Sequence, residues 1–365
     1  MNFSPRRTVA RIDLGAIAAN FRTIRERSGR RVLAVVKANA YGHGARKVAR
    51  ALEDAGADFF CVAVTEEGIE LRRAGIRSPI LLLNFADPRD APAHRAFGLT
   101  PALWSLEQIR AFSDATAGWR EPLPVHLKVD SGLSRLGVLP GEVAEAARLV
   151  AGSPGLRLEA AFSHFSHGED PTHPTRSRQT ETARAAFAAL ESAGLRGFWT
   201  HLANSGAALE GAPCDAVRPG LLLYGISPAA GAPDLAPALA WETEVIAVKR
   251  VPSATAVGYG GTFVTGRPTT LAVLSIGYDD GYRRSLSGRV PVLLTKGAVP
   301  TVGAISMDLT VCDATGVPVA PGDRAVLIGN AGGRTVSARD LAAAAGTIPY
   351  EILCGIGRRV PRRYD

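Results

Sequence analysis

The stretch VLAVVKANAYGHG, residues 32–44, joins an apolar run to a loop of small and polar residues. No polar side chain interrupts the run at residues 32–36, which is typical of a strand buried on both faces. Lys37 follows at once, and its amine needs either water or a chemical partner. The stretch therefore predicts a buried strand whose carboxyl end carries either a functional lysine or one that extends to solvent.

The same pattern repeats along the first two thirds of the chain. Apolar strand-like runs occur at Val32–Val36, Phe59–Val64, Pro79–Asn84, Leu99–Leu103, Val125–Val129, Leu158–Phe162, Phe198–Leu202 and Leu221–Tyr224. Helix-like segments lie between most of them, at Gly44–Ala55, Glu66–Ala74, Leu106–Ala115, Glu142–Val150 and Thr175–Ala193. Eight strands alternating with helices over roughly 200 residues are typical of a (β/α)8 barrel. We predict an α/β fold with this barrel over residues 8–230. A doubly wound open sheet is the alternative, because alternation alone does not show closure.

A Pro-, Gly- and Ala-rich stretch at residues 227–237 ends the alternation. Strand-like runs follow at Trp241–Arg250, Thr270–Ile276, Val290–Leu294, Val299–Asp308 and Arg324–Ile328, with Ser337–Ala345 as the only clear helix. This pattern predicts a C-terminal mainly-β domain over residues 237–365. Thr8–Leu14 also has a strand pattern and can join that domain.

The composition is that of an ordinary globular protein, with 365 residues, 46% of them hydrophobic, and a net charge of +8. No apolar stretch is long enough to span a bilayer, and the first residues lack the apolar core of a signal peptide, so we predict a cytoplasmic protein that binds no membrane. The four cysteines have no paired spacing, which disfavours disulfides and a metal site. The arginines are dispersed, so we predict no nucleic-acid binding.

Polar motifs gather where the predicted barrel strands end. They are Lys37, KVDSGLSR (128–135), SHF (163–165), HLANS (201–205) and RPG (218–220). Active sites of such barrels lie at the carboxyl ends of the strands. A lysine that is desolvated or close to other cations is a nucleophile and a base, and it can bind an aldehyde cofactor, most often pyridoxal phosphate. The alternative is a lysine that only reaches solvent.

The motifs resemble those of alanine racemases over almost the whole chain. AVVKANAYGHG (34–44) resembles their cofactor-lysine signature, and the other matching motifs are KVDSGLSRLG (128–137), HLANS (201–205), VGYGGT (257–262), IGYDDGY (276–282), SMD (306–308) and YEILC (350–354). The resemblance implies a (β/α)8 barrel followed by a β domain. It also implies interconversion of L- and D-alanine with pyridoxal 5'-phosphate, to supply D-alanine for peptidoglycan. A broader-specificity amino-acid racemase of the same fold is the alternative.

The resemblance also implies a set of cofactor-binding residues. Lys37 would hold the aldehyde, His164 would stack near the cofactor, and Arg218 would face the pyridine nitrogen. The phosphate end would be held by Tyr41, Ser205, Gly220, Leu221 and Tyr350, and Asn204 would also bind the cofactor. An arginine donates hydrogen bonds but does not give up its proton, so Arg218 would not protonate the ring. A neutral ring is a weaker electron sink, which would limit side reactions such as transamination.

Racemisation requires proton removal from one face of Cα and proton delivery to the other, which two bases perform most directly. The resemblance implies Lys37 and Tyr259 as these bases, with His164 and Arg218 assisting the tyrosine. It further implies a homodimer in which Tyr259 and Met307 come from the other subunit. Arg135 and the backbone of Met307 would hold the substrate carboxylate. Lys128 occupies the place of a carbamylated lysine, and Tyr278 resembles a residue of the substrate entrance.

The sequence departs from the family pattern in two places. Leu133 and Ser134 replace a common Met-Gly pair, and Ser306 stands where some members carry cysteine. Neither change removes a catalytic group. Two other classes fit less well. A decarboxylase of basic amino acids with this domain order would need a cysteine-centred motif in the β domain, and a non-catalytic cofactor-binding barrel would lack that domain.

Overall fold

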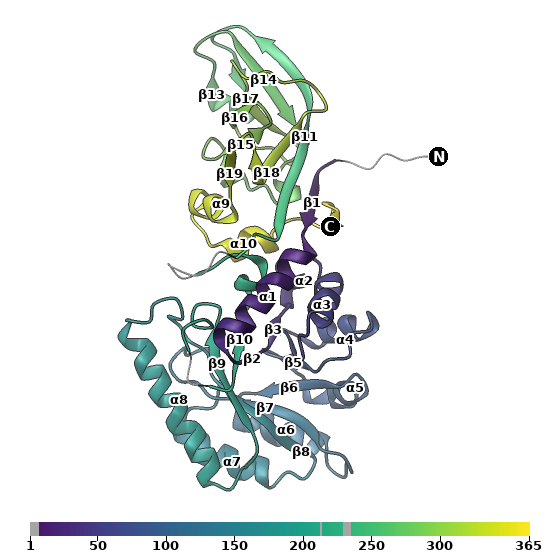
Figure 1. The fold of residues 1–365 in the computed structure, drawn as a ribbon, viewed down its shortest axis with the longest axis vertical. Coiled ribbons are helices and arrows are strands. Elements are labelled where there is room, and N and C mark those ends of the chain that lie inside the picture. The colour runs from purple at the N-terminus through teal and green to yellow at the C-terminus, as the bar shows by residue number, and fades with distance from the viewer. Residues whose placement is uncertain (1–6, 212–213, 229–234) are drawn as a thin grey trace. The chain divides into compact units, whose positions relative to one another are not determined.

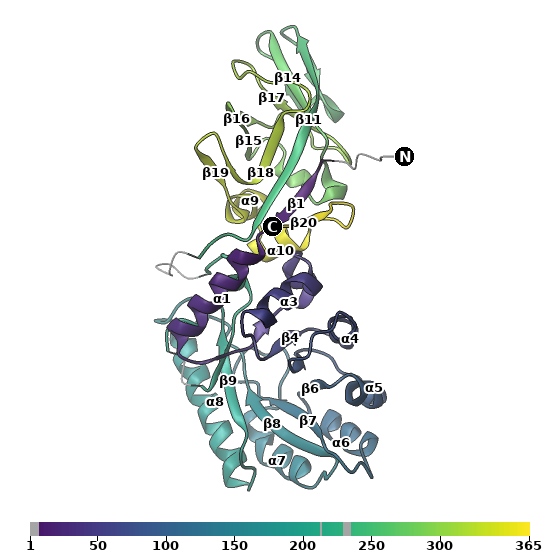
Figure 2. The ribbon, with the colours of Figure 1, turned by 45° about the vertical axis from the view of Figure 1, so that its right-hand side comes forward.

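The computed structural model describes residues 7–211, 214–228 and 235–365. The chain forms two compact units. One extends from Gly15 to Ala236, and the other combines the N-terminal strand with the chain from Pro237 onward. Figure 1 and Figure 2 label their helices and strands.

The larger unit is a parallel sheet that closes on itself. Its order is β2-β10-β9-β8-β7-β6-β5-β4-β3. Their bounds are β2 Arg31–Val32, β3 Ala34–Val35, β4 Phe60–Val62, β5 Ile80–Leu82, β6 Leu99–Leu103, β7 Leu123–Lys128, β8 Leu156–Phe162, β9 Trp199–Asn204 and β10 Ala216–Arg218. β2 and β3 are one strand interrupted at Leu33, whose N–H donates to Val217 O at 2.9 Å. This strand pairs with β10 on one side and β4 on the other, so the predicted barrel is confirmed and the open sheet is wrong.

Helices lie on the outside of this barrel (Figure 1, Figure 2). They are α1 Leu14–Ser28, α3 Ala45–Asp54, α4 Thr65–Arg73, α5 Ala91–Ala96, α6 Leu106–Ala115, α7 Val143–Ala151 and α8 Pro174–Ser192. In α6, Ser105 caps the first turn by accepting the Gln108 N–H, and Ile109 and Phe112 are buried. The three-residue spacing of this pair is that of one helix face turned to the core.

The eighth strand is not where the sequence pattern placed it. The strand is β10, whereas Leu221–Tyr224 forms a short 3-10 helix, η3. Pro219 cannot donate a ladder hydrogen bond, so the sheet pairing ends before the apolar run begins. The run is apolar because η3 is buried throughout. Burial was therefore predicted correctly, but the conformation was wrong.

The second unit is mainly β, as predicted. Its strands are β1 Val9–Ile12, β11 Leu239–Val251, β12 Ala256–Val257, β13 Phe263–Val264, β14 Thr269–Leu274, β15 Pro291–Leu294, β16 Gly297–Pro300, β17 Thr310–Asp313, β18 Arg324–Ala331, β19 Arg334–Val336 and β20 Arg362–Tyr364. The long strand β11 pairs with β1, β14 and β18, so the N-terminal strand belongs to this sheet.

Two predictions for this unit were wrong. The expected strand at Val299–Asp308 ends at Pro300, because Gly303 has a φ of 67° and the chain then turns at Ser306. A second helix, α10 Pro349–Cys354, follows α9 Ala338–Ala345. Pro349 lies in the first turn of α10, where proline is common, and could have indicated this helix.

Among the described residues, no helix is long and apolar enough to cross a membrane. No group of three or more His, Cys, Asp or Glu side chains in that part of the chain is placed to hold a metal ion.

Candidate active site

Lys37 begins a left-handed turn at the end of β3. The turn is the short helix α2 Lys37–Tyr41, in which residues 38–41 have φ between 50° and 54°. Such a conformation costs roughly 1–2 kcal/mol for each residue other than glycine. Glu67 supports the turn by accepting the N–H groups of Ala38 at 2.6 Å and Ala63 at 2.7 Å. Backbone strain that surrounding contacts hold in place is typical of functional sites. Here the contacts of Glu67 hold the strained backbone beside Lys37, which is half-buried.

Small groups and backbone donors gather near the ends of β9 and β10. The Tyr41 hydroxyl lies so close to Gly220 that a Cβ at that position would collide with it. The Gly220 N–H donates to Ser205 Oγ at 2.8 Å. η3 begins at Leu221, and the first N–H groups of a helix have no carbonyl partner within it. The Gly220 N–H is used by Ser205, so the Ser205 hydroxyl hydrogen and the first N–H groups of η3 remain to form a cradle suited to an anion such as phosphate.

Arg218 is buried at the end of β10, and four acceptors lie within hydrogen-bond distance of its two Nη atoms. Its acceptors are His201 Nδ1 at 2.5 Å, Ser163 O at 2.7 Å, Leu202 O at 3.1 Å and His164 Nδ1 at 3.1 Å. Burial lowers the pKa of Arg218 to about 10, which still leaves the guanidinium charged near neutral pH. Arg218 is therefore a rigid, permanent donor.

A chain of side chains continues from Arg218 across the barrel wall. His201 Nε2 lies 3.0 Å from His126 Nδ1, and His126 Nε2 lies 3.3 Å from Glu159 Oε2. An arginine only donates and a carboxylate only accepts, so each histidine must accept on one ring nitrogen and donate from the other. Burial lowers the pKa of both His126 and His201, which favours these neutral rings.

The sequence places His201 in the HLANS motif without a role of its own, and the prediction named neither His126 nor Glu159. One signal was available, because residues two apart on a strand share a face. His126 stands two positions before Lys128 on β7. A histidine on the face of a site residue is a candidate for its supporting network.

Positive charge is concentrated at this end of the barrel. Lys128 is buried at the end of β7, and its pKa is lowered to about 8 by burial and then by Arg135 and Arg218. The pKa of His164 is lowered well below its ordinary value by burial and by Arg218, Lys128, Arg135 and Lys37. The structure thus brings these predicted residues into one electrostatic environment, which favours anionic ligands.

Two predicted residues near this cluster have structural contacts. Asn204 donates to Phe165 O at 3.3 Å and accepts the Gly206 N–H at 3.1 Å, so its amide ties two loops together. Arg135 is exposed, on a loop that Asp130 holds by accepting three successive N–H groups, from residues 132 to 134.

The remaining predicted residues lie in the mainly-β unit. Tyr259 is 76% exposed, Met307 52% and Tyr278 43%. Their loops adjoin, because the Tyr278 N–H donates to Ser306 O at 3.0 Å and Gly303 packs against the Val257 carbonyl. Tyr350 is half-buried in α10 of the same unit.

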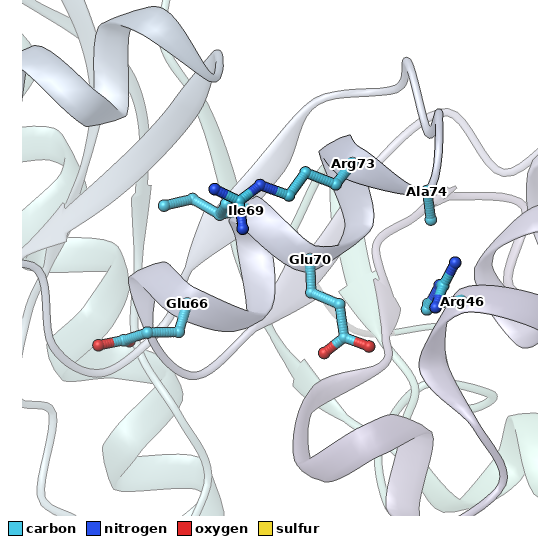
Figure 3. Close-up of a pocket in the computed structure, with 6 residues that line it drawn as sticks. All are labelled: Arg46, Glu66, Ile69, Glu70, Arg73 and Ala74. Atoms are coloured by element: carbon cyan, nitrogen blue, oxygen red, sulfur yellow. The ribbon is translucent and has the colours of Figure 1, made fainter.

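A groove on the barrel's outer layer lies apart from this cluster of predicted residues. Figure 3 shows its lining residues on α3, α4 and the turn after α4: Arg46, Glu66, Ile69, Glu70, Arg73 and Ala74. None of them is a predicted site residue, and the groove runs along helices rather than across strand ends. It is therefore not the candidate active site.

A parallel barrel that presents a lysine, a buried arginine and an anion cradle at its strand ends has the arrangement of a cofactor-dependent barrel enzyme. Comparison with known proteins identifies the family of barrel enzymes to which the chain belongs. The alanine racemase N-terminal domain family matches residues 12–228, and the C-terminal domain family matches residues 238–364. The chain belongs to the alanine racemase family.

Individual relatives match over nearly their full length. The alanine racemase of Symbiobacterium thermophilum is 42% identical, with 98% of this chain and 97% of the relative covered. That of Synechocystis is 41% identical, with 96% and 97% covered.

Solved structures agree with the fold. The alanine racemase of E. faecalis superimposes with a TM-score of 0.93 at 34% identity, covering 99% of this chain and 98% of that one. The Bacillus anthracis enzyme with bound L-Ala-P gives 0.93 at 33% identity, covering 100% and 96%. The Bartonella henselae enzyme with covalently bound pyridoxal phosphate gives 0.90 at 33% identity, covering 99% and 100%.

Proposed function

We propose that this chain interconverts L- and D-alanine with pyridoxal 5'-phosphate, using Lys37 and Tyr259 as its two bases. The observation that carries the proposal is the grouping of Lys37, the anion cradle at Gly220 and the permanent donor Arg218 at one end of the barrel, in a chain of the alanine racemase family.

The chemistry of these groups fits the cofactor. The Lys37 amine suits the aldehyde, and the cradle of Ser205, Gly220 and Leu221 suits the phosphate, with Tyr41 and Tyr350 as further partners. Arg218 suits the pyridine nitrogen because it donates without giving up its proton. When bound, the cofactor draws electrons from Cα so that a proton can leave.

The protein residues then divide the work on the substrate. Lys37 removes or delivers the Cα proton on one face, and Tyr259 does so on the other. Arg135 and the Met307 N–H hold the carboxylate. His164 stays neutral, since burial and the surrounding cations lower its pKa, and it accepts from Arg218.

The exposure of Tyr259, Tyr278 and Met307 supports a homodimer in which each active site draws residues from both subunits. Large apolar side chains exposed together are typical of surfaces that another chain covers. The cell compartment we propose is the cytoplasm, where the D-alanine would feed peptidoglycan synthesis.

Cα proton exchange tests the activity directly. In D2O with pyridoxal phosphate, the protein should convert L-alanine to D-alanine and place deuterium at Cα, which NMR detects. The same measurement on a panel of L-amino acids tests substrate breadth. No exchange with alanine would contradict the proposed function.

Borohydride reduction of the cofactor-loaded protein should fix the cofactor on Lys37. The reason is that Lys37 combines a strand-end position with partial burial beside other cations. Peptide mapping locates the label, and the exposed Lys296 serves as an internal control for non-specific modification. A label mainly on Lys128 or Lys296 would refute the assignment.

Lys128 should carry a carbamate. Only a neutral amine reacts with carbon dioxide, and a pKa lowered to about 8 leaves much of this amine neutral at mildly alkaline pH. The carbamate would place a negative charge beside Arg135, so the repulsion between Lys128 and Arg135 would become an attraction. With 13C-bicarbonate we expect a carbamate NMR signal at pH 9 that fades as the pH falls below about 8, where the amine becomes protonated. A signal that persists in Lys128→Arg would show that another lysine reacts.

A further inference from the structure

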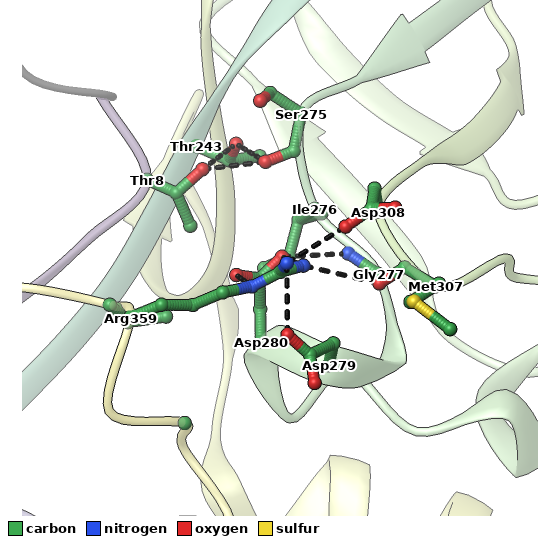
Figure 4. A network of polar contacts seen from close by, with 12 residues as sticks. Thr8, Thr243, Ser275, Ile276, Gly277, Asp279, Asp280, Met307, Asp308 and Arg359 are labelled. Carbon is green, nitrogen blue, oxygen red and sulfur yellow. Dashed lines mark hydrogen bonds and ion pairs between the residues drawn. The ribbon is translucent and has the colours of Figure 1, made fainter.

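Arg359 is the centre of a polar network in the mainly-β unit (Figure 4). Its guanidinium meets Asp280 Oδ1 at 2.7 Å, Asp308 Oδ1 at 2.8 Å, Asp279 Oδ2 at 2.9 Å and Met307 O at 3.3 Å. A planar fork of five N–H donors can serve acceptors in several directions at once, which the point charge of a lysine cannot.

The acceptors belong to two loops that are packed against each other. One is the short helix η5 Tyr278–Asp280, and the other is the turn at residues 306–309. The Asp279 N–H donates to Met307 O at 3.1 Å, and a Cβ at Gly277 would collide with that carbonyl. Arg359 joins both loops to a third segment of the chain.

The network fixes the direction of the Met307 N–H. A peptide group is planar and trans, so the Met307 N–H points opposite to the Ser306 carbonyl. That carbonyl accepts the Tyr278 N–H, so the Met307 N–H points away from η5. Arg359 holds the next peptide group through Met307 O, which fixes the turn on both sides of Met307.

The network also controls nearby negative charge. Asp279 and Asp308 have side chains that are 55% and 58% exposed, and Asp280 is fully buried. Without a cation between them, these carboxylates would repel one another and any anion that approaches Met307. Arg359 draws all three toward itself.

We propose that Arg359 is a positioning residue for recognition of the substrate carboxylate. It fixes the Met307 turn and turns the adjacent carboxylates away from the anion. The inference rests on the proposed function, in which the Met307 N–H binds that carboxylate. Arg359 itself touches no reacting atom.

Steady-state kinetics of Arg359→Lys and Arg359→Gln test the role. Hydrogen bonds to charged groups contribute enough that KM for alanine should rise by about 10-fold to 100-fold, with kcat changed less than about 5-fold. Cα exchange of alaninamide, which lacks the carboxylate, should change less than about 3-fold because the lost recognition concerns only that group. An equal loss for both compounds would overturn the inference, because it would mark a general structural role.

Arg362→Gln is the matched control. Arg362 lies in the same segment and donates to the carbonyls of residues 356, 357 and 360. Its loss should lower the thermal stability while KM for alanine stays within about 2-fold.

If Arg359→Gln does not fold, Arg359→Lys still tests the role. Methylguanidinium should also rescue Arg359→Ala, because the Arg359 side chain is 35% exposed and the compound can enter the space it leaves. An unchanged KM in a racemising enzyme would contradict this inference alone, whereas an inactive wild type would contradict the proposed function as well.

Discussion

Replacing Tyr259 with phenylalanine should abolish proton abstraction from L-alanine while slow Cα exchange from D-alanine persists. The substitution keeps the ring and removes only the hydroxyl, so one of the two proposed bases is lost and Lys37 remains. Loss of a well-placed base lowers a rate by typically ~10²–10⁴. NMR in D2O, started separately from each enantiomer, measures the two directions. Tyr364→Phe, a second tyrosine of the same unit, is the control and should behave as wild type. Equal losses in both directions would argue against two separate bases.

A subunit-mixing experiment extends this result to the dimer. A hybrid of Lys37→Ala and Tyr259→Phe subunits should contain one site with both bases and one site with neither. Activity should therefore return on mixing two nearly inactive proteins. If native mass spectrometry shows that hybrids form and no activity returns, both bases belong to one subunit and the shared-site proposal is wrong.

Arg218→Glu should slow racemisation and raise transamination. A carboxylate beside the pyridine nitrogen favours a proton there, and a protonated ring is a stronger electron sink. The ratio of pyruvate to D-alanine formed measures this partition. Arg218→Gln is the matched control, because its amide can donate a hydrogen bond but does not give up a proton, so it should lose rate without the by-product. An unchanged partition in a folded Arg218→Glu variant would mean that Arg218 does not face the ring nitrogen.

Stability must be measured alongside, because Arg218 serves three buried acceptors and the part-buried His164. Buried acceptors left without a donor cost about 1–3 kcal/mol each. Thermal unfolding should therefore move to lower temperature in both Arg218 variants. The partition ratio is independent of the folded fraction, so it remains interpretable.

Several barrel strands could be predicted because they are continuous apolar runs, as at Phe60–Val62. The eighth could not, because β10 has only three residues and ends in Arg218. The longer apolar run at Leu221–Tyr224 resembles a strand more closely and is buried without joining the sheet. Apolar character reports burial, and only hydrogen bonding separates a strand from a buried turn.

The site shows the same limit. The predicted residues lie in motifs that are contiguous in sequence, as Ser205 does in HLANS. The chain from His201 through His126 to Glu159 crosses neighbouring strands that are far apart in sequence. His201 belongs to HLANS, but His126 and Glu159 each resemble an ordinary core or surface residue. The left-handed turn after Lys37 was equally hidden, because Asn39 is the only one of its four residues whose type often adopts positive φ, and Ala38, Ala40 and Tyr41 rarely do so.

The left-handed turn at residues 38–41 sets thermal stability against activity in this protein. Glycine adopts positive φ without penalty, so changing Ala38 or Ala40 to glycine would relieve backbone strain that the native residues carry. The same change would make the backbone next to Lys37 more flexible. A directed-evolution campaign that rewards survival at high temperature alone would therefore tend to accumulate changes beside the reactive lysine and lose turnover, unless activity is screened in every round.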